Sequence, residues 1–333
     1  MRVAINGFGR IGRAVFRLLN SRPGCEIVAV NDIAEPAALA YLLRHDTVMG
    51  PFQGVAEVEG DVLKTKHQKV KMLAVPDPAQ LPWKALGADY VIESTGRFRK
   101  RDQIAAHLTA GAKKVLLTVP AKDEIDATIV MGVNDEDLKP EHRIVSNASC
   151  TTNCLAPIAW ILDREFGIEY GLMTTVHAYT NDQRLADVPH SDWRRSRAAA
   201  ENIIPTTTGA ARAVGKVMPH LKGKLDGTAM RVPIPDGSIV DLVSVMKRPV
   251  TTREVNEAVR AAASTPRLRA IVRYSEDALV SRDIVGDPHS SIFDAEYTQV
   301  VDGTLLKTLS WYDNEWGYSN RVVDLIEMMD KLG

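Results

Sequence analysis

A glycine pattern near the N-terminus narrows the possible folds of this chain more than any other feature. Gly7, Gly9 and Gly12 match G-x-G-x-x-G; they follow the apolar segment Val3–Asn6 and open an amphipathic segment at about residues 10–21. Glycines at such a turn let the backbone approach a pyrophosphate, and the following helix N-terminus supplies N–H donors. The pattern predicts a Rossmann-type dinucleotide site, although a purely structural turn remains an alternative.

One acidic residue supports the dinucleotide interpretation. Asp32 follows a second apolar segment, Ile27–Asn31, and lies where a carboxylate accepts hydrogen bonds from the adenosine ribose. The same negative charge would repel a 2′-phosphate. We therefore expect NAD rather than NADP as the cofactor.

Short apolar segments alternate with helical segments through residues 1–149. This alternation predicts an α/β domain with a doubly wound, mostly parallel sheet, and we assign NAD binding to it. The expected strands are Val3–Asn6, Ile27–Asn31, Val70–Ala74, Tyr90–Ser94, Lys114–Thr118, Thr128–Val133 and Ile144–Ser146, with further helices at Ala37–His45 and Arg101–Thr109.

Longer alternating segments follow residue 150 and predict a second, α+β domain with a mixed or antiparallel sheet. We assign residues 150–318 to this catalytic domain and expect the C-terminal helix, 319–332, to pack back on the first domain. The expected elements are helices at 150–166 and 252–263 and strands at Gly171–His177, Thr228–Val232 and Ser238–Met246.

Composition argues against several classes of protein. Lys and Arg total 41 and Asp and Glu total 42, so the net charge of -1 gives no overall attraction to nucleic acid or acidic membranes. No apolar run is long enough to span a bilayer, and the N-terminus does not resemble a signal peptide. Three cysteines, an odd and sparse set, fit a reducing compartment. We expect a cytoplasmic protein.

Two residues are candidates for catalysis. Cys150 is expected to begin a helix, whose N-terminus stabilises a thiolate, but a buried small side chain is an equally open interpretation. Burial is the expected role of Cys25 and Cys154. His177 ends an apolar strand, and the spacing alone does not bring it to Cys150. No Cys-x-x-Cys or His-Glu-x-x-His pattern occurs, so we expect no metal.

Long motifs spread over nearly the whole chain resemble the phosphorylating glyceraldehyde-3-phosphate dehydrogenase family. The cysteine motif is the longest and most specific of them. The motifs are INGFGRIGR (5–13), ND (31–32), STGRF (94–98), SNASCTTNCLAP (146–157), TTVHAYTNDQR (174–184), IIPTTTGAA (203–211), KGKLDG (222–227), RVPIPDGSIVDL (231–242) and WYDNEWGYSNR (311–321).

The resemblance implies a reaction and a set of site residues. Cys150 would attack the aldehyde and His177 would act as the base, and inorganic phosphate would cleave the resulting thioester to give 1,3-bisphosphoglycerate. The implied NAD-binding residues are Gly7, Phe8, Gly9, Arg10, Ile11, Gly12, Asp32, Thr95, Gly96, Asn314 and Tyr318. The implied phosphate-binding residues are Thr180, Asp182 and Arg231 for the substrate, with Asp182 orienting Arg231, and Ser149, Thr151, Arg195, Thr208 and Gly209 for the attacking phosphate.

The resemblance also implies a homotetramer, with residues 178–202 near the subunit contacts. One departure from the family pattern is Val119, where many relatives carry a smaller residue near the nicotinamide. The alternative closest in chemistry is erythrose-4-phosphate dehydrogenase, but retention of YTNDQ at 179–183 and TTTG at 206–209 favours glyceraldehyde 3-phosphate.

An alternative of another class is RNA binding in the dinucleotide groove, for which the only motivation is a pair of basic clusters. These are Arg97 with residues 99–101, and residues 194–197. We interpret the second cluster as solvated surface and the first as a solvated face or the lining of an anionic cofactor site, because the near-neutral charge of the chain gives no strong electrostatic footprint for nucleic acid.

Overall fold

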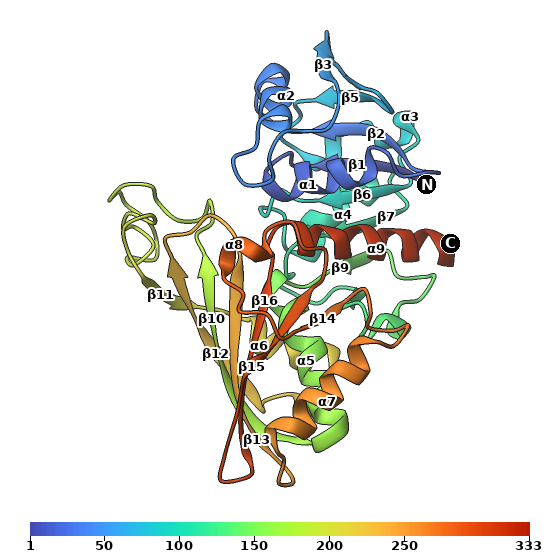
Figure 1. Cartoon of the computed structure of the whole chain (residues 1–333). Helices are drawn as coiled ribbons and strands as arrows, with labels where there is room; N and C mark the ends of the chain where they lie inside the picture. Colours follow the sequence, from blue (N-terminus) through green and yellow to red (C-terminus); the bar gives the residue numbers. More distant parts are fainter. The chain divides into compact units, whose positions relative to one another are not determined.

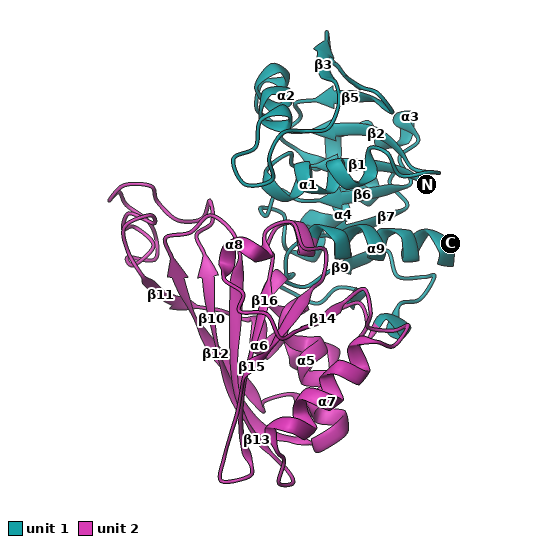
Figure 2. Ribbon diagram, viewed as in Figure 1, with its two compact units in different colours: residues 1–129, 135–149, 319–333 teal, residues 130–134, 150–318 magenta.

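The computed structural model describes residues 1–333 and divides into two compact units. Unit 1 comprises residues 1–129, 135–149 and 319–333, and unit 2 comprises residues 130–134 and 150–318 (Figure 2). Unit 1 is therefore built from both ends of the chain. No helix in either unit is both long enough and apolar enough to cross a membrane.

Unit 1 contains a nine-stranded sheet in the order β3-β4-β5-β2-β1-β6-β7-β9-β8 (Figure 1). The strands from β5 to β8 in this order pair in parallel, and β3 and β4 add antiparallel pairs at one edge. The predicted doubly wound α/β fold is confirmed. The strands are β1 (Arg2–Asn6), β2 (Glu26–Asn31), β3 (Ala56–Glu59), β4 (Val62–Thr65), β5 (Lys69–Leu73), β6 (Tyr90–Glu93), β7 (Lys114–Leu117), β8 (Ala127–Thr128) and β9 (Ile144–Ser146).

The helices of unit 1 pack against this sheet and complete an apolar core. Trp83, Ile104 and Val115 are fully buried in it and come from α3, α4 and β7. Burial of such side chains is the main stabilising contribution to a domain of this size. The helices are α1 (Arg10–Leu19), α2 (Pro36–Arg44), α3 (Trp83–Leu86), α4 (Arg101–Thr109) and the part of α9 (Trp316–Leu332) from residue 319 onward.

Unit 2 contains a seven-stranded mixed sheet in the order β11-β12-β10-β13-β16-β15-β14. β10 pairs in parallel with β12, and β14 with β15, whereas the other neighbours are antiparallel. The predicted mixed sheet is confirmed. The strands are β10 (Ile168–Ala178), β11 (Ile204–Thr207), β12 (Leu225–Val232), β13 (Ser238–Met246), β14 (Val272–Ser275), β15 (Ser291–Val301) and β16 (Leu305–Tyr312).

The helices of unit 2 cover one face of its sheet: α5 (Cys150–Phe166), α6 (Ala210–Val217) and α7 (Thr252–Ala263) (Figure 1). A short helix, α8 (Ser281–Ile284), precedes β15. Along β13 buried residues alternate with half-buried ones, as expected for a strand with one covered face. On the other face, Tyr170 and Leu172 are more than half exposed.

One predicted strand is wrong. Residues 128–133 were expected to be extended, but β8 ends at Thr128 and the chain then turns. The side chain of Asn134 accepts a hydrogen bond from the Val130 N–H at 2.9 Å, and Gly132 adopts a φ of +81°. A side-chain acceptor and a left-handed glycine stabilise a turn even where the neighbouring residues are apolar.

Candidate active site

The glycines of the first motif form a close junction between β1, α1 and the turn after β6. Gly7 has a φ of +96°, and a Cβ placed on it would lie 2.6 Å from the Thr95 backbone nitrogen. A Cβ on Gly12 would lie 2.0 Å from the Gly7 carbonyl oxygen. Gly9, which precedes α1, would meet nothing within 4 Å. Gly7 and Gly12 therefore permit backbone packing, whereas Gly9 leaves open space at the helix N-terminus.

Asp32 lies in the pocket beside this junction. Its carboxylate accepts hydrogen bonds from the backbone N–H of Phe8 at 2.7 Å and of Ala34 at 3.1 Å. The Phe8 ring is fully buried and packs edge-on against Phe16, so Phe8 offers only its backbone to a ligand. Arg10 forms an ion pair with Asp46 at 2.6 Å, so its guanidinium is already engaged by a carboxylate of the protein.

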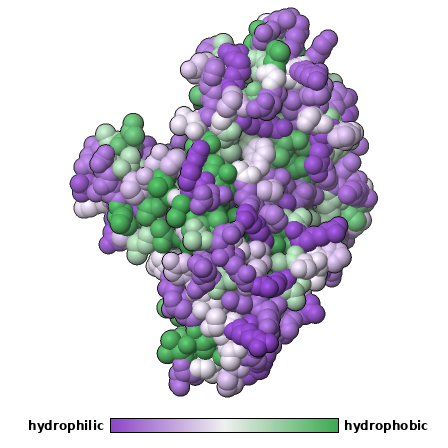
Figure 3. Space-filling model, viewed as in Figure 1, coloured by the Kyte–Doolittle hydropathy of each residue, from purple (hydrophilic) through white to green (hydrophobic).

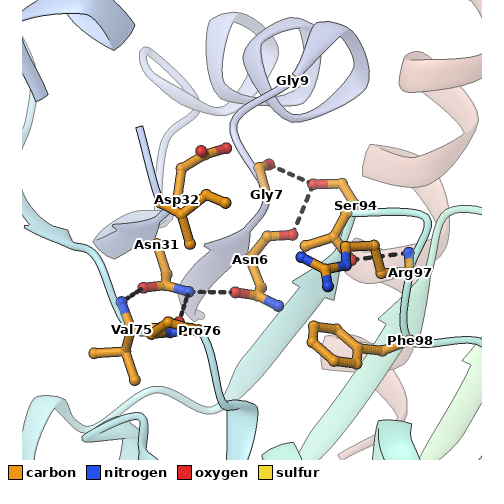
Figure 4. Close-up of a pocket in the computed structure, with 12 residues that line it drawn as sticks. Asn6, Gly7, Gly9, Asn31, Asp32, Val75, Pro76, Ser94, Arg97 and Phe98 are labelled. Carbon is orange, nitrogen blue, oxygen red and sulfur yellow. Dashed lines mark hydrogen bonds between the residues drawn. The ribbon is translucent and has the colours of Figure 1, made fainter. Parts of the chain in front are cut away.

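Among the predicted cofactor residues of unit 1, the pocket is lined by Gly7, Gly9, Asp32 and Thr95 (Figure 4). Ile11, Gly12 and Gly96 are outside its lining, as are Phe8 and Arg10. The lining residues that sequence reasoning missed are Asn6, Asn31, Ile33, Val75, Pro76, Ser94, Arg97 and Phe98. The position of Asn6, Asn31 and Ser94 at or next to parallel strand ends was an available signal, because ligands bind there.

Arg97 and Phe98 decide between two interpretations of the basic cluster around Phe98, a solvated face or the lining of an anionic cofactor site. Both residues line the pocket (Figure 4). The other arginines of the cluster are engaged elsewhere in unit 1: Arg99 donates to the Pro120 carbonyl at 3.1 and 3.0 Å, and Arg101 pairs with Asp126 at 2.5 Å.

The second candidate site is in unit 2, where Cys150 begins α5 and His177 lies near the end of β10. Their side chains meet, with 3.5 Å between Cys150 Sγ and His177 Nε2. Just before the helix, Ala148 adopts a φ of +55°, a conformation that non-glycine residues rarely take. Strain of this kind is concentrated at functional sites.

Burial sets the protonation of this pair. It is the largest influence on the Cys150 thiol and raises its pKa, although Arg231 and hydrogen bonds at Thr151 act in the opposite direction. We expected the helix N-terminus to favour the thiolate, but the net effect of these influences is a raised Cys150 pKa. Burial, with help from Arg231, lowers the pKa of His177 to about 3. At neutral pH the pair is therefore a thiol beside a neutral imidazole.

The His177 ring is held on two sides. Its Nδ1 lies 2.7 Å from the carbonyl oxygen of Ala178 and also contacts the Arg231 guanidinium, which can only donate. A proton on Nδ1 satisfies the carbonyl and leaves Nε2 as the acceptor toward Cys150, whereas the Arg231 contact favours the other tautomer. The edge of Tyr312 packs against the ring with 5.9 Å between centroids. The Tyr312 hydroxyl lies within hydrogen-bond distance of Thr151 and Thr175, at 2.7 and 2.8 Å.

Arg231 reaches the same place because β12 runs parallel to β10 with Arg231 opposite His177. Its guanidinium contacts His177 Nδ1 and donates to the Ala178 carbonyl at 2.9 Å. Burial lowers the pKa of Arg231. A half-buried guanidinium beside the reactive pair is a suitable partner for an anionic group.

Asp182 lies among the charged groups that act on Arg231, but its direct ion pair is with another arginine. Its carboxylate pairs with Arg195, and Arg195 also donates to the Thr206 hydroxyl at 3.0 and 2.9 Å. Sequence spacing did not indicate this pair, because it does not show which side chains meet across two loops. Arg195 is thus held in place from several sides.

The other predicted phosphate residues lie on short turns and helix starts. Thr208 and Gly209 precede α6, where the Thr208 hydroxyl accepts from the Ala210 N–H at 3.2 Å. Thr180 begins a turn in which its N–H donates to the Gln183 side chain at 3.2 Å. Thr151 directs its hydroxyl to Tyr312, while Ser149 is half-buried immediately before α5.

Asn314 and Tyr318 are both buried in unit 2. The Ser238 hydroxyl accepts a hydrogen bond from the Ala178 N–H at 3.1 Å and donates its own proton to Asn314 Oδ1 at 2.6 Å. Because a hydroxyl has one proton, this arrangement fixes the Asn314 amide with its NH₂ free to donate. Ser238 is a further residue of the site that sequence reasoning missed.

Comparisons with known proteins cover nearly the whole chain. Two family models match: the NAD binding domain of glyceraldehyde 3-phosphate dehydrogenase over residues 1–101, and the C-terminal domain of the same enzyme over residues 149–314. Similar proteins include the glyceraldehyde-3-phosphate dehydrogenase of Streptomyces coelicolor, at 57% identity over 98% of this chain and 97% of the relative. The glyceraldehyde-3-phosphate dehydrogenase of Geobacillus stearothermophilus is 56% identical over 98% of this chain and 97% of the relative. Glyceraldehyde-3-phosphate dehydrogenase 1 of Bacillus subtilis is 53% identical over 100% of this chain and 99% of the relative.

Proposed function

The chain belongs to the glyceraldehyde-3-phosphate dehydrogenase family, and from this premise we propose that it oxidises glyceraldehyde 3-phosphate to 1,3-bisphosphoglycerate through Cys150 and His177. It is an NAD-dependent oxidoreductase. The observation that carries the proposed chemistry is the 3.5 Å approach of Cys150 Sγ to His177 Nε2. A thiol next to a properly oriented base is the arrangement that nucleophilic catalysis requires.

Unit 1 is the proposed NAD-binding domain, and its pocket suits that cofactor. Gly9 leaves open space at the N-terminus of α1, where a pyrophosphate is favoured by backbone N–H groups. Asp32 presents a carboxylate for ribose hydroxyls, and Arg97 adds a positive charge to the lining. Asn314 and Tyr318 of unit 2 are proposed to contact the nicotinamide carboxamide and ring.

In the proposed mechanism, His177 removes the Cys150 proton through Nε2, acting as the tautomer whose own proton is on Nδ1 and faces the Ala178 carbonyl. The sulfur then attacks the aldehyde carbon to form a thiohemiacetal, and His177 donates toward its oxygen. The lowered pKa of His177 keeps the imidazole neutral and able to accept at working pH, but it also makes His177 a weaker base than a histidine with an ordinary pKa.

A bound NAD would supply the hydride acceptor for this oxidation, and the hydroxyl proton of the thiohemiacetal would return to His177 as the thioester forms on Cys150. Inorganic phosphate then attacks the thioester carbon, the C–S bond breaks, and the Cys150 thiol regains a proton from His177. We assign the attacking phosphate to Ser149, Thr151, Arg195, Thr208 and Gly209, and the substrate phosphate to Thr180 and Arg231. Hydroxyls, backbone N–H groups and guanidinium groups are the donors that tetrahedral oxyanions require.

We also propose that the protein is a cytoplasmic homotetramer. Large apolar side chains are exposed on unit 2, and Figure 3 shows hydrophobic residues at its surface. Leu185 and Trp193 are 85% and 87% exposed within the segment predicted to lie near subunit contacts. Exposed apolar patches mark interaction surfaces, so coverage by further subunits is the arrangement we favour. The three cysteines are unpaired, which fits a reducing compartment.

The decisive test follows NADH formation from glyceraldehyde 3-phosphate, with and without inorganic phosphate, in parallel with erythrose 4-phosphate. We expect sustained, phosphate-dependent turnover and a preference for glyceraldehyde 3-phosphate. Faster turnover of erythrose 4-phosphate would change the substrate assignment. Absence of turnover with freshly reduced protein would overturn the proposed reaction, and salt-dependent retention of RNA would then become the next measurement.

A further inference from the structure

A carboxylate is completely buried beneath the dinucleotide pocket of unit 1. Glu93, the last residue of β6, has no exposed surface. Its Oε1 accepts hydrogen bonds from the Thr95 N–H at 2.8 Å and from the Thr95 hydroxyl. Its Oε2 accepts from Asn6 Nδ2 at 2.6 Å and lies 3.0 Å from His107 Nε2. Four donors therefore converge on two oxygens.

The direction of every hydrogen bond in this network follows from one fixed donor. Trp83 Nε1, which can only donate, lies 3.0 Å from His107 Nδ1. His107 must therefore carry its proton on Nε2 and donate it to Glu93. Since Glu93 accepts throughout, Asn6 must present its NH₂ to Glu93 and its oxygen away from it.

Asn6 passes this orientation on to Asn31 in the pocket lining (Figure 4). Asn31 Nδ2 donates to Asn6 Oδ1 at 2.7 Å and to the Val75 carbonyl at 2.9 Å, and Asn31 Oδ1 accepts from the Val75 N–H at 2.8 Å. Asn6, Asn31, Val75 and Thr95 all line the pocket. Glu93 thus sets the orientation of the Asn6 amide, and the Asn6 oxygen meets the Asn31 NH₂, which the Val75 backbone holds in the matching orientation.

Stability does not explain such a group. Burying a carboxylate carries a desolvation cost that apolar residues of similar volume would avoid, and the surrounding core is otherwise apolar. Buried polar networks that are fully satisfied serve instead to specify one arrangement. Here the specified arrangement belongs to the residues that line the pocket.

We propose that Glu93 is a positioning residue for the cofactor: it fixes the amide orientation of Asn6, which matches that of Asn31, and holds the turn at Thr95. The inference rests on the proposed NAD site in unit 1. Glu93 itself is shielded from the pocket, so it acts through the residues that it orients.

The test is Glu93→Gln, which preserves shape but introduces an NH₂ group. In either orientation of the Gln amide, this NH₂ faces a donor, which is Asn6 and His107 in one case and the Thr95 N–H in the other. We expect the dissociation constant of NAD, measured by titration of intrinsic fluorescence, to rise by about tenfold. The KM for NAD should rise similarly, whereas kcat at saturating NAD should stay within about twofold of wild type, since no group of the reactive pair has changed.

Ile104→Val is the matched control, because Ile104 is fully buried in the same core and takes no part in the network. It should lower the melting temperature while leaving NAD affinity unchanged. Trp83→Phe removes the donor on His107 together with part of the buried indole packing, and it should give a smaller rise in the NAD dissociation constant than Glu93→Gln. This variant decides the question if Glu93→Gln does not fold.

The outcomes distinguish failure of the proposed NAD site from failure of the positioning role of Glu93. If wild-type protein fails to bind NAD, the proposed cofactor site is wrong. If wild type binds NAD and both Glu93→Gln and Trp83→Phe bind it equally well, or lose affinity only as their thermal stability falls, Glu93 is structural and the positioning role is overturned.

Discussion

The two candidate sites differ in what they are made of and in how far apart their parts lie in the sequence. The pocket of unit 1 is built largely from backbone at a glycine turn, with Asp32 a short distance along the chain. The reactive site of unit 2 is built from side chains of Cys150, His177, Arg231 and Tyr312, which β10, β12 and β16 bring to the start of α5. A site built from backbone depends on the absence of a Cβ at its glycines, whereas a site built from side chains depends on particular functional groups.

The largest expected effect is in unit 2. Cys150→Ser replaces the nucleophile with a much weaker one and should lower kcat by at least about 10³-fold, while NAD affinity stays unchanged. Initial rates of NADH formation and a separate NAD titration would measure the two quantities. If kcat and NAD affinity both fell in this variant, the two sites would not be independent.

His177→Asn should have the next largest effect. It removes the base while keeping a polar side chain, and we expect kcat to fall by about 10²- to 10⁴-fold. Raising the pH should restore part of the rate, because hydroxide then deprotonates the Cys150 thiol without a base. A pH-independent loss would show that His177 is not the proton acceptor.

Two glycines sharpen the description of unit 1. Gly7→Ala places a Cβ 2.6 Å from the Thr95 nitrogen and forces alanine into a φ of +96°, so it should destabilise the protein by about 2 kcal/mol or more and weaken NAD binding. Gly9→Ala meets no atom within 4 Å and should preserve stability while weakening NAD binding, because Gly9 lines the pocket. Thermal melts and NAD titrations of both variants are the measurement. Equal melting temperatures would contradict the packing argument.

The buried imidazole makes a smaller, pH-dependent contribution to stability. Between its ordinary pKa of 6.5 and its folded pKa of about 3, His177 binds a proton in the unfolded chain but not in the folded protein. Its contribution is complete above pH 6.5 and is lost as the pH falls toward 3, by up to about 1.4 kcal/mol per pH unit. Urea unfolding at pH 7, 6 and 5 should show a steeper loss in wild type than in His177→Asn. Parallel losses would show that this imidazole titrates normally.

The smallest expected effect concerns Ser238. Ser238→Ala removes the hydroxyl that fixes the Asn314 amide, and we expect the KM for NAD to rise by about threefold. Ser244 is the matched control, since it is buried on the same strand and its hydroxyl has no hydrogen-bond partner. Ser244→Ala should leave KM unchanged. A similar change in both variants would assign the effect to β13 as a whole.

The comparison also explains how much could be predicted from the sequence. The fold class and most elements followed from periodicity, and the glycine turn followed from its local motif. The Cys150–His177 pair followed only from the family resemblance, because contact between residues on α5 and β10 depends on the whole sheet. For the same reason the ion pair of Asp182 with Arg195 was not predicted, and the pocket positions of Asn6 and Asn31 were missed.

The C-terminal helix has a consequence for the order in which the molecule can be completed. Residues 319–333 belong to the same unit as the first strand, and Glu327 pairs with Arg22 near the beginning of the chain. The ribosome synthesises residues 150–318 between these two parts. The nascent N-terminal unit therefore lacks its last helix until those residues have been made. Domains usually fold in the order of synthesis, but here the first unit to emerge is the last to be finished, and its apolar surface beneath α9 stays uncovered for that interval.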